Sequence, residues 1–236
     1  MIKILMSLIA LAFTLNATEV YATFTVEPEK KAMLAFDAGG IVQKVNYDIA
    51  SSVKKGAILA SLSNLDTKAT LQSAKTVLKF AKKDFDRQVK VKNLIDEGKF
   101  DQYVFKYENA KNKLAFAQAQ YNKTYLKAPF NGVVYEKNIE VGDTVSGMML
   151  KTVFKIQSKS RRKLILGFDQ KYHKSVKVGQ SFRYGVDGDD KEYIGVITKV
   201  YPFANSKNRK IEAEVKAENF IVGLFGEGYI IIPETK

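Results

Sequence analysis

Cysteine and histidine, two residue types that often perform catalysis or bind metals, are scarce in this chain. Its 236 residues include no cysteine and a single histidine, His173. A histidine-based catalytic triad, a multi-histidine metal site and a cysteine-ligated zinc or iron–sulfur centre therefore cannot form within one chain. We interpret His173 as a solvated loop residue. We expect no catalytic residue, no cofactor site and no metal site, so the sequence does not predict an enzyme.

Two further patterns imitate ligand sites. The Asp-Gly-Asp-Asp run at residues 187–190 resembles part of a calcium loop, but it lacks the ligand spacing and the closing glutamate. We predict a β-turn there. Gly223, Gly226 and Gly228 do not follow a strand, phosphate loop and helix in order. We predict that these glycines serve turns and bind no nucleotide.

The chain is strongly basic, with 38 Lys and Arg against 25 Asp and Glu and a net charge of +13. A nucleic-acid-binding protein concentrates its basic residues on one face. Here they are spread along the whole chain, and few of them are arginines. We therefore predict no nucleic-acid partner. Solubility and contact with acidic partners or anionic lipid headgroups explain the charge more simply.

The N-terminus has the pattern of an export signal. Lys3 precedes an apolar run at residues 4–15, and the small residues Ala17 and Ala22 follow. Spanning a bilayer takes about 20 apolar residues, so this run is short for a membrane helix. We predict a signal peptide at residues 1–22, cleaved after Ala17 or Ala22. The alternative is a short anchor that is never cut.

An internal repeat organises the first two thirds of the chain. Residues 40–45, Gly-Ile-Val-Gln-Lys-Val, return 92 positions later as Gly-Val-Val-Tyr-Glu-Lys at residues 132–137. Alternating Val and Ile between glycine-containing turns is typical of short strands. Neither copy is long enough to bury both of its faces. We therefore expect residues 37–63 and 126–158 to pair into one domain.

Between the two copies, residues 64–125 have a different character. They contain no proline and only one glycine, Gly98. Apolar residues recur at alternating steps of three and four, which predicts a heptad seam on each of two helical arms. The seam residues are Leu71, Ala74, Leu78, Ala81 and Phe85, then Tyr103, Tyr107, Ala110, Leu114, Ala117, Tyr121 and Thr124. We predict an antiparallel coiled-coil hairpin that breaks at residues 96–99, with Asp101 capping the second helix. A first arm of about 30 residues would be about 45 Å long.

Residues 159–236 return to a strand pattern. Apolar or alternating stretches occur at 164–166, 193–200, 211–215 and 229–232, with a hairpin turn at Asp187-Gly188. Residues 24–26, within an N-terminal segment 23–36, are expected to add an edge strand. The predicted fold class is mainly β with a long helical hairpin: a split β-sandwich interrupted by the coiled coil, followed by a small β-barrel.

This arrangement resembles the periplasmic adaptors, or membrane fusion proteins, of tripartite efflux systems. The resemblance rests on residues 53–59, 126–134, 141–145, 197–202 and 208–209. It implies that the split sandwich is a lipoyl-like domain. The first half departs from the family at Ala50, where the second half has a turn glycine. Because the sequence ends soon after the expected barrel, the match is to a short form of the adaptors that serve resistance-nodulation-division (RND) pumps.

The resemblance implies a function and a binding site. Such adaptors link an inner-membrane pump to a TolC-type outer-membrane channel, and several copies form a ring in the periplasm. The family's tip motif of arginine, leucine and serine falls here on Lys90, Leu94 and Asp101. The leucine is kept. Lysine retains the charge of arginine without its forked guanidinium, and aspartate adds a negative charge.

Three alternatives stay open at this stage. The first is an adaptor for an ATP-driven or type I secretion exporter, although those tend to have a retained N-terminal membrane helix and a longer hairpin. The second is a lipoyl or biotin carrier, but the helical segment replaces the tight turn that presents the modified lysine, and Lys68 sits at its start. The third is a periplasmic coiled-coil chaperone, which would need neither the sandwich nor the barrel.

Overall fold

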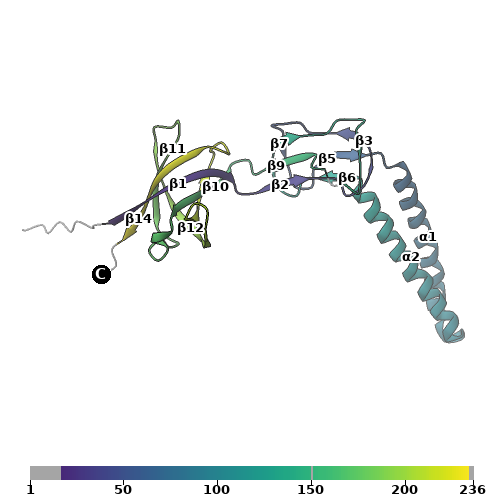
Figure 1. Cartoon of the computed structure of the whole chain (residues 1–236). Helices are drawn as coiled ribbons and strands as arrows, with labels where there is room; N and C mark the ends of the chain where they lie inside the picture. The colour runs from purple at the N-terminus through teal and green to yellow at the C-terminus, as the bar shows by residue number, and fades with distance from the viewer. Residues whose placement is uncertain (1–16, 150, 234–236) are drawn as a thin grey trace, which may run out of the picture. The chain divides into compact units, whose positions relative to one another are not determined.

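A computed structural model describes residues 17–149 and 151–233. The chain divides into two compact units (Figure 1). Among the described residues, 30–149 and 151–159 form a β-sandwich with a long helical hairpin, and 17–29 together with 160–233 form a second unit that contains a closed β-barrel. The predicted fold class, mainly β with a helical hairpin, is confirmed.

The sandwich consists of two four-stranded sheets, ordered β2-β9-β7-β4 and β6-β5-β3-β8. The strands are β2 (Lys31–Leu34), β3 (Gly40–Val45), β4 (Ser52–Val53), β5 (Ile58–Leu62), β6 (Tyr125–Lys127), β7 (Gly132–Lys137), β8 (Thr144–Val145) and β9 (Phe154–Gln157). Each sheet contains strands from both copies of the repeat. The copies therefore exchange strands instead of packing as two separate halves.

Reciprocal hydrogen bonds show the symmetry of this exchange. The Ala50 amide donates to the Val134 carbonyl at 2.8 Å, and the Gly142 amide donates to the Val42 carbonyl at 2.9 Å. These two bonds are related by the 92-residue offset found in the sequence. A second symmetric pair of hydrogen bonds follows the same offset. The Val42 amide donates to the Asp143 carbonyl, and the Val134 amide donates to the Ser51 carbonyl. Since each half completes the backbone pairing of the other, neither half can form its sheet alone.

The sandwich core lies between these sheets. Its fully buried side chains come from both copies and include Leu59, Leu62, Phe154 and Ile156, each 0% exposed. Burial alternates along β9, as the period-two pattern predicts, whereas four consecutive residues of β5, from Leu59 to Leu62, are buried. Burying side chains of this size stabilises the fold by about 1.5–3 kcal/mol each.

Ala50 occupies a turn that suits glycine. Its φ is +68°, and the corresponding residue of the second copy, Gly142, has a φ of +96°. A side chain in this left-handed region costs about 1–2 kcal/mol. The turn keeps its conformation despite the departure at Ala50, because the Ala50 amide is held by Val134.

The second unit is a closed barrel of six strands in the order β1-β10-β13-β12-β11-β14. The strands are β1 (Ala17–Pro28), β10 (Arg161–Asp169), β11 (Ser181–Val186), β12 (Glu192–Asn205), β13 (Lys210–Glu218) and β14 (Phe225–Pro233), with a 3₁₀ turn at Gln170–Tyr172. All pairs are antiparallel. The barrel therefore has no open sheet edge.

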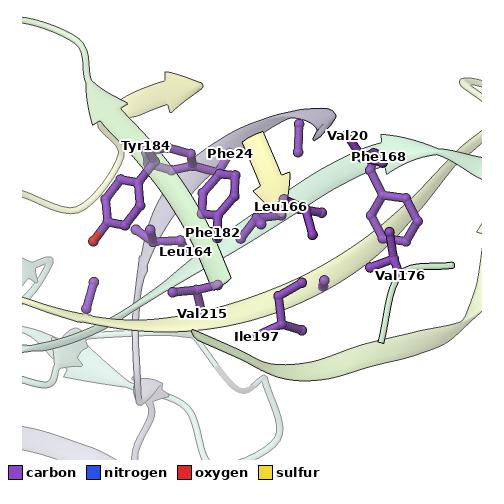
Figure 2. Packing of buried hydrophobic residues seen from close by; sticks show 14 of the residues in the cluster. Val20, Phe24, Leu164, Leu166, Phe168, Val176, Phe182, Tyr184, Ile197 and Val215 are labelled. Atoms are coloured by element: carbon purple, nitrogen blue, oxygen red, sulfur yellow. The ribbon is translucent and has the colours of Figure 1, made fainter. Parts of the chain in front are cut away.

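Aromatic and branched side chains fill the barrel (Figure 2). Phe24 meets the rings of Phe182 and Tyr184 edge-on, with centroids 5.8 and 5.3 Å apart. Leu166 and Ile197 are 0% exposed in the same cluster. These contacts tie β1 to the strands that follow the sandwich in sequence.

β1 is longer and more central than the expected edge strand. It pairs with β10 on one side and with β14 on the other, so it closes the barrel. It begins at Ala17, inside the segment 1–22, and Val20 and Ala22 are completely buried. The apolar run at residues 4–15 lies outside the described residues. The expected N-terminal segment 23–36 is divided, because β2 (Lys31–Leu34) pairs with β9 in the sandwich.

Two of the three glycines expected in turns lie in a strand instead. Gly223 has a φ of +93° and lies in a turn, whereas Gly226 and Gly228 lie within β14. A Cβ on Gly226 would come within 2.5 Å of the Phe24 ring. The expectation of turns was wrong for Gly226 and Gly228, because close packing across the barrel requires them.

Among the residues that the structure describes, no helix is both long and apolar enough to cross a membrane.

Replacing Ala50 with glycine tests the symmetry of the sandwich. Glycine removes the side-chain strain of the left-handed turn, while it also adds freedom to the unfolded chain. We expect Ala50→Gly to stabilise the protein by about 0.5–1 kcal/mol, which raises the Tm by about 1–4 °C. Gly142→Ala is the matched control, because its new Cβ meets no atom within 4 Å. It should lower the Tm. A destabilised Ala50→Gly protein would contradict this interpretation.

Candidate partner-binding surface at the hairpin tip

The hairpin leaves the sandwich through two neighbouring strands. β5 leads into the first helix and β6 follows the second, and these strands pair with each other. The Leu62 amide donates to the Thr124 carbonyl at 2.9 Å, and the Asn64 side-chain amide donates to the Tyr125 hydroxyl at 2.9 Å. The hydroxyls of Tyr121 and Tyr125 are 2.6 Å apart, and this hydrogen bond raises the pKa of Tyr121. Both helices are thus fixed at their base.

The two arms are α1 (Leu65–Lys90) and α2 (Glu97–Lys123), of 26 and 27 residues. They run side by side (Figure 1). The expected seam is confirmed: Leu71, Ala110 and Ala117 are buried, and every other seam residue except the buried Thr124 is half-buried. At 1.5 Å per residue, α1 is about 39 Å long. It is shorter than expected because the α-helix ends at Lys90.

Aromatic rings pack together at the end of the seam that lies away from the sandwich. Phe85 of α1 stacks on Tyr107 of α2 with centroids 5.1 Å apart, and its ring lies 6.1 Å from that of Phe100. The Lys92 ammonium lies 5.0 Å from the centre of the Phe100 ring. The sequence interpretation missed Phe100, although it continues the seam spacing three residues before Tyr103. These contacts hold the turn between the helices against the end of the seam.

The turn itself is short and well bonded. A 3₁₀ turn, Lys92–Leu94, follows α1, and Ile95 is extended. The Asp96 side chain accepts a hydrogen bond from the Lys99 amide at 3.1 Å and caps α2. The expectation that Asp101 caps the second helix was wrong, because α2 begins earlier and Asp101 already lies inside it. An aspartate directly before Glu97 was the sequence signal for the correct cap.

The structure brings the three residues of the motif to this end of the hairpin. Lys90 is the last residue of α1, Leu94 ends the 3₁₀ turn, and Asp101 lies in the second turn of α2. All three side chains are exposed, and Leu94 is 83% exposed. The tip therefore presents one apolar side chain with charges of both signs around it. Such a surface can insert a leucine into an apolar pocket whose rim is charged.

The other candidate residues have structural roles. His173 is exposed, as predicted, and its Nδ1 lies 3.1 Å from the Gln170 carbonyl oxygen. Asp189 lies in the predicted β-turn, and a hydrogen bond from the Tyr193 hydroxyl at 2.6 Å lowers its pKa. Lys68 is in the first turn of α1, so it is not presented on a tight turn between strands. Within residues 17–149 and 151–233, no group of three His, Asp or Glu side chains could hold a metal ion.

Comparisons with known proteins agree with this architecture. The sequence model of the family described as "CzcB-like, barrel-sandwich hybrid domain" matches residues 30–157. The cobalt-zinc-cadmium resistance protein CzcB of Cupriavidus metallidurans is 24% identical over 213 residues, which are 81% of this chain and 40% of that protein. An uncharacterised protein of Haemophilus influenzae is 22% identical over 91% of this chain and 58% of its own length. The chain thus spans about half the length of the curated relatives that it matches.

Solved structures share the fold. A MacA–MexA chimera that contains the α-hairpin domain of Pseudomonas aeruginosa MexA superposes with a TM-score of 0.83 at 20% identity, covering 93% of this chain and 84% of the chimera. ZneB from Cupriavidus metallidurans superposes with a TM-score of 0.61 at 17% identity, covering 92% of this chain and 71% of ZneB. At these identities the likeness shows the fold alone.

A charge in the seam tests how the hairpin is held together. Leu114→Asp places a carboxylate between the helices without a partner, which costs several kcal/mol. We expect lost helical circular dichroism and no change in the barrel. Ala115→Asp is the matched control, because Ala115 is an exposed neighbour on the same helix. Equal helicity in the Leu114→Asp and Ala115→Asp proteins would show that the seam is placed wrongly.

Proposed function

Because this chain belongs to the family of membrane fusion proteins, or periplasmic adaptors, through its CzcB-like barrel-sandwich hybrid domain, we propose that it links an inner-membrane RND-type pump to a TolC-type outer-membrane channel. Members of this family perform no catalysis, and the chain is not an enzyme. We propose that it performs this role in the periplasm.

One observation carries the proposal: a helical arm about 39 Å long is anchored in the sandwich at one end and exposes Leu94 at the other. A leucine that is 83% exposed leaves apolar area that a partner can bury. The paired strands β5 and β6 fix the base of the hairpin, and the stacked rings of Phe85 and Tyr107 fix its other end. Leu94 therefore loses little conformational freedom when a partner binds. The channel would bind this tip.

Several copies acting together would provide the affinity. A single buried leucine contributes about 1.5–3 kcal/mol, which is too little for a stable complex alone. In a ring of identical adaptors every tip would meet the channel at once, and the contributions would add. The barrel would face the pump.

The name of one relative suggests the cargo class. CzcB of Cupriavidus metallidurans is described as a cobalt-zinc-cadmium resistance protein. We propose that the pump served by this chain exports divalent transition-metal cations. Since the described part of the chain has no group of three His, Asp or Glu side chains that could hold a metal, the pump would bind the cation.

Export of the chain can be tested at its N-terminus. We propose cleavage of the signal peptide after Ala17. Cleavage after Ala22 would remove the pairs of Val20 with Ile230 and of Tyr21 with Tyr229 from the barrel. N-terminal sequencing of the periplasmic protein should therefore begin at Thr18. A mature chain that begins at Thr23 would contradict the barrel closure, and an intact Met1 in the membrane fraction would indicate an uncut anchor.

Leu94→Asp tests docking at the tip. The variant should fold normally, because Leu94 is 83% exposed, and it should lose resistance to zinc, cobalt and cadmium. Leu65→Asp is the matched control, since Leu65 is 74% exposed at the opposite end of α1. It should keep wild-type resistance and an unchanged Tm.

Different results would contradict the docking of the tip and the proposed metal cargo. Full metal resistance in cells with a stable Leu94→Asp protein would contradict the assignment of the tip. If deleting the gene changed susceptibility to organic drugs but not to metals, the adaptor role would stand and the proposed cargo would be wrong.

A further inference from the structure

The loops at the two ends of the barrel carry opposite charge. At the end where β1 begins, residues 169–180 and 201–209 contain five Lys and Arg and one acidic residue, Asp169. At the other end, the loops 187–191 and 219–224 contain three Asp and one Lys. The basic residues are spread along the sequence, but folding gathers a group of them at one end of the barrel. We call residues 169–180 and 201–209 the basic cap.

The first segment of the basic cap closes the mouth of the barrel. β10 and β11 are not neighbours in the barrel, so residues 170–180 must cross its end to connect them. Val176, in the middle of this segment, is 3% exposed and belongs to the barrel core (Figure 2). The Gly179 amide also donates to the Ile197 carbonyl at 2.9 Å. Because Val176 enters the core, the lysines around it remain on the outer surface: Lys171, Lys174 and Lys177.

Hydrogen bonds hold the cap in one conformation. The Gln170 amide donates to the Arg209 carbonyl at 3.0 Å and joins the two segments. The Gln180 side chain accepts a hydrogen bond from the Lys177 amide at 2.9 Å and donates one to the Ser175 carbonyl at 2.8 Å. The cap is therefore a built surface whose charges have defined places.

The cations of the cap lack acidic partners. All five are exposed, and none forms an ion pair with an acidic residue in the described part of the chain: Lys171, Lys174, Lys177, Lys207 and Arg209. On the wall of the barrel, by contrast, Lys163 and Lys199 both pair with Glu214, at 3.4 and 3.1 Å. A cluster of uncompensated cations attracts a negatively charged partner.

Apolar side chains lie among these cations. Val178 and Phe203 are 61% and 57% exposed. A hollow of about 710 Å³ opens between the two segments of the cap, with Lys171 on one side and Pro202 and Phe203 on the other. Basic residues combined with exposed aromatic and aliphatic side chains are what a protein uses to bind at the interface of a membrane.

We propose that the basic cap binds the surface of the inner membrane through anionic phospholipid headgroups. The cations lie against the lipid phosphates, and Val178 and Phe203 enter the headgroup layer. The start of the barrel supports this direction, because Ala17 pairs with Pro233 at the capped end and follows the apolar run at residues 4–15 in the sequence. The aspartates at the other end of the barrel are repelled by the same lipids, so the barrel binds with the cap toward the membrane.

This contact goes beyond the proposed function, on which it rests only for the location in the periplasm. Cleavage after Ala17 would remove the apolar run from the mature chain. The cap would then hold the barrel at the membrane in which the pump lies. Neither the pump nor the channel takes part in this contact, so it can be measured with the purified chain alone.

Flotation with lipid vesicles tests the contact. The mature chain beginning at Thr18, which lacks only the Ala17–Pro233 pair of the barrel, is mixed with vesicles of phosphatidylglycerol and phosphatidylcholine in equal parts. We expect binding that weakens as salt is added and that is absent with phosphatidylcholine alone. Each lysine near an anionic surface strengthens binding about fivefold, so Lys174→Gln combined with Lys207→Gln should weaken it about 25-fold.

A second pair of lysines provides the matched control. Lys75→Gln combined with Lys79→Gln changes the net charge equally, but these exposed lysines lie on α1. That protein should bind vesicles like the wild type. Phe203→Ser should weaken binding several-fold. Its own control is Phe225→Ser, since Phe225 is 61% exposed at the acidic end of the barrel. All variants should keep the wild-type Tm.

Three results would overturn the proposal. If the wild-type chain does not bind anionic vesicles, the partner of the cap is an acidic protein surface. If both pairs of lysine substitutions weaken binding equally, only the net charge of the chain attracts it. If inorganic phosphate displaces the chain from vesicles more strongly than chloride at the same ionic strength, the cap binds single anions and not a membrane. Leu94→Asp should bind vesicles like the wild type, so none of these results contradicts the docking of the tip.

Discussion

The exchange of strands between the two halves of the sandwich is the constraint on which the rest of the structure depends. Val42 and Val134 each bond to a turn of the opposite half, through Gly142 and Ala50. Neither half can satisfy its backbone without the other, so the 62 residues from Ser63 to Thr124 must leave and return within one folded domain. A long insertion at such a place costs little loop entropy when its ends are already neighbours. The insertion is free to become a projecting arm.

Contacts at the base, along the seam and at the tip hold the helical hairpin rigid over its whole length. The hydrogen bonds of Asn64 and Tyr125 fix where the helices begin, the small residues of the seam let them pack closely, and the stacked rings of Phe85 and Tyr107 fix where they end. The exposed side chain of Leu94 is consequently held in a defined place. A rigid arm loses little entropy when it docks, and this is what repeated weak contacts in a ring require. In the proposed function, the stability of the sandwich and the docking of the tip are thus physically connected.

Sequence periodicity predicted the repeat, the seam and most barrel strands, because each leaves a regular pattern of apolar residues. It did not predict features that depend on contacts between distant segments. Gly226 looks like a turn glycine until the Phe24 ring is placed against it. Val20 follows the apolar run of the predicted export signal, but in the structure it pairs with Ile230 inside the barrel. Leu94 lies in the turn between the helices, and its role in docking stays a prediction. The cap of the second helix was assigned to Asp101 instead of Asp96, because a helix start depends on the local turn.

The central claim is that the tip touches an outer-membrane channel, and a photoreactive amino acid at position 94 tests it most directly. Irradiating intact cells covalently joins that side chain to whatever it touches, and mass spectrometry of the adduct identifies the partner. The account predicts an adduct with an outer-membrane channel protein that is absent when the same photoreactive residue replaces Leu65. An adduct at position 94 with an inner-membrane or freely soluble periplasmic protein, and none with a channel, would contradict it.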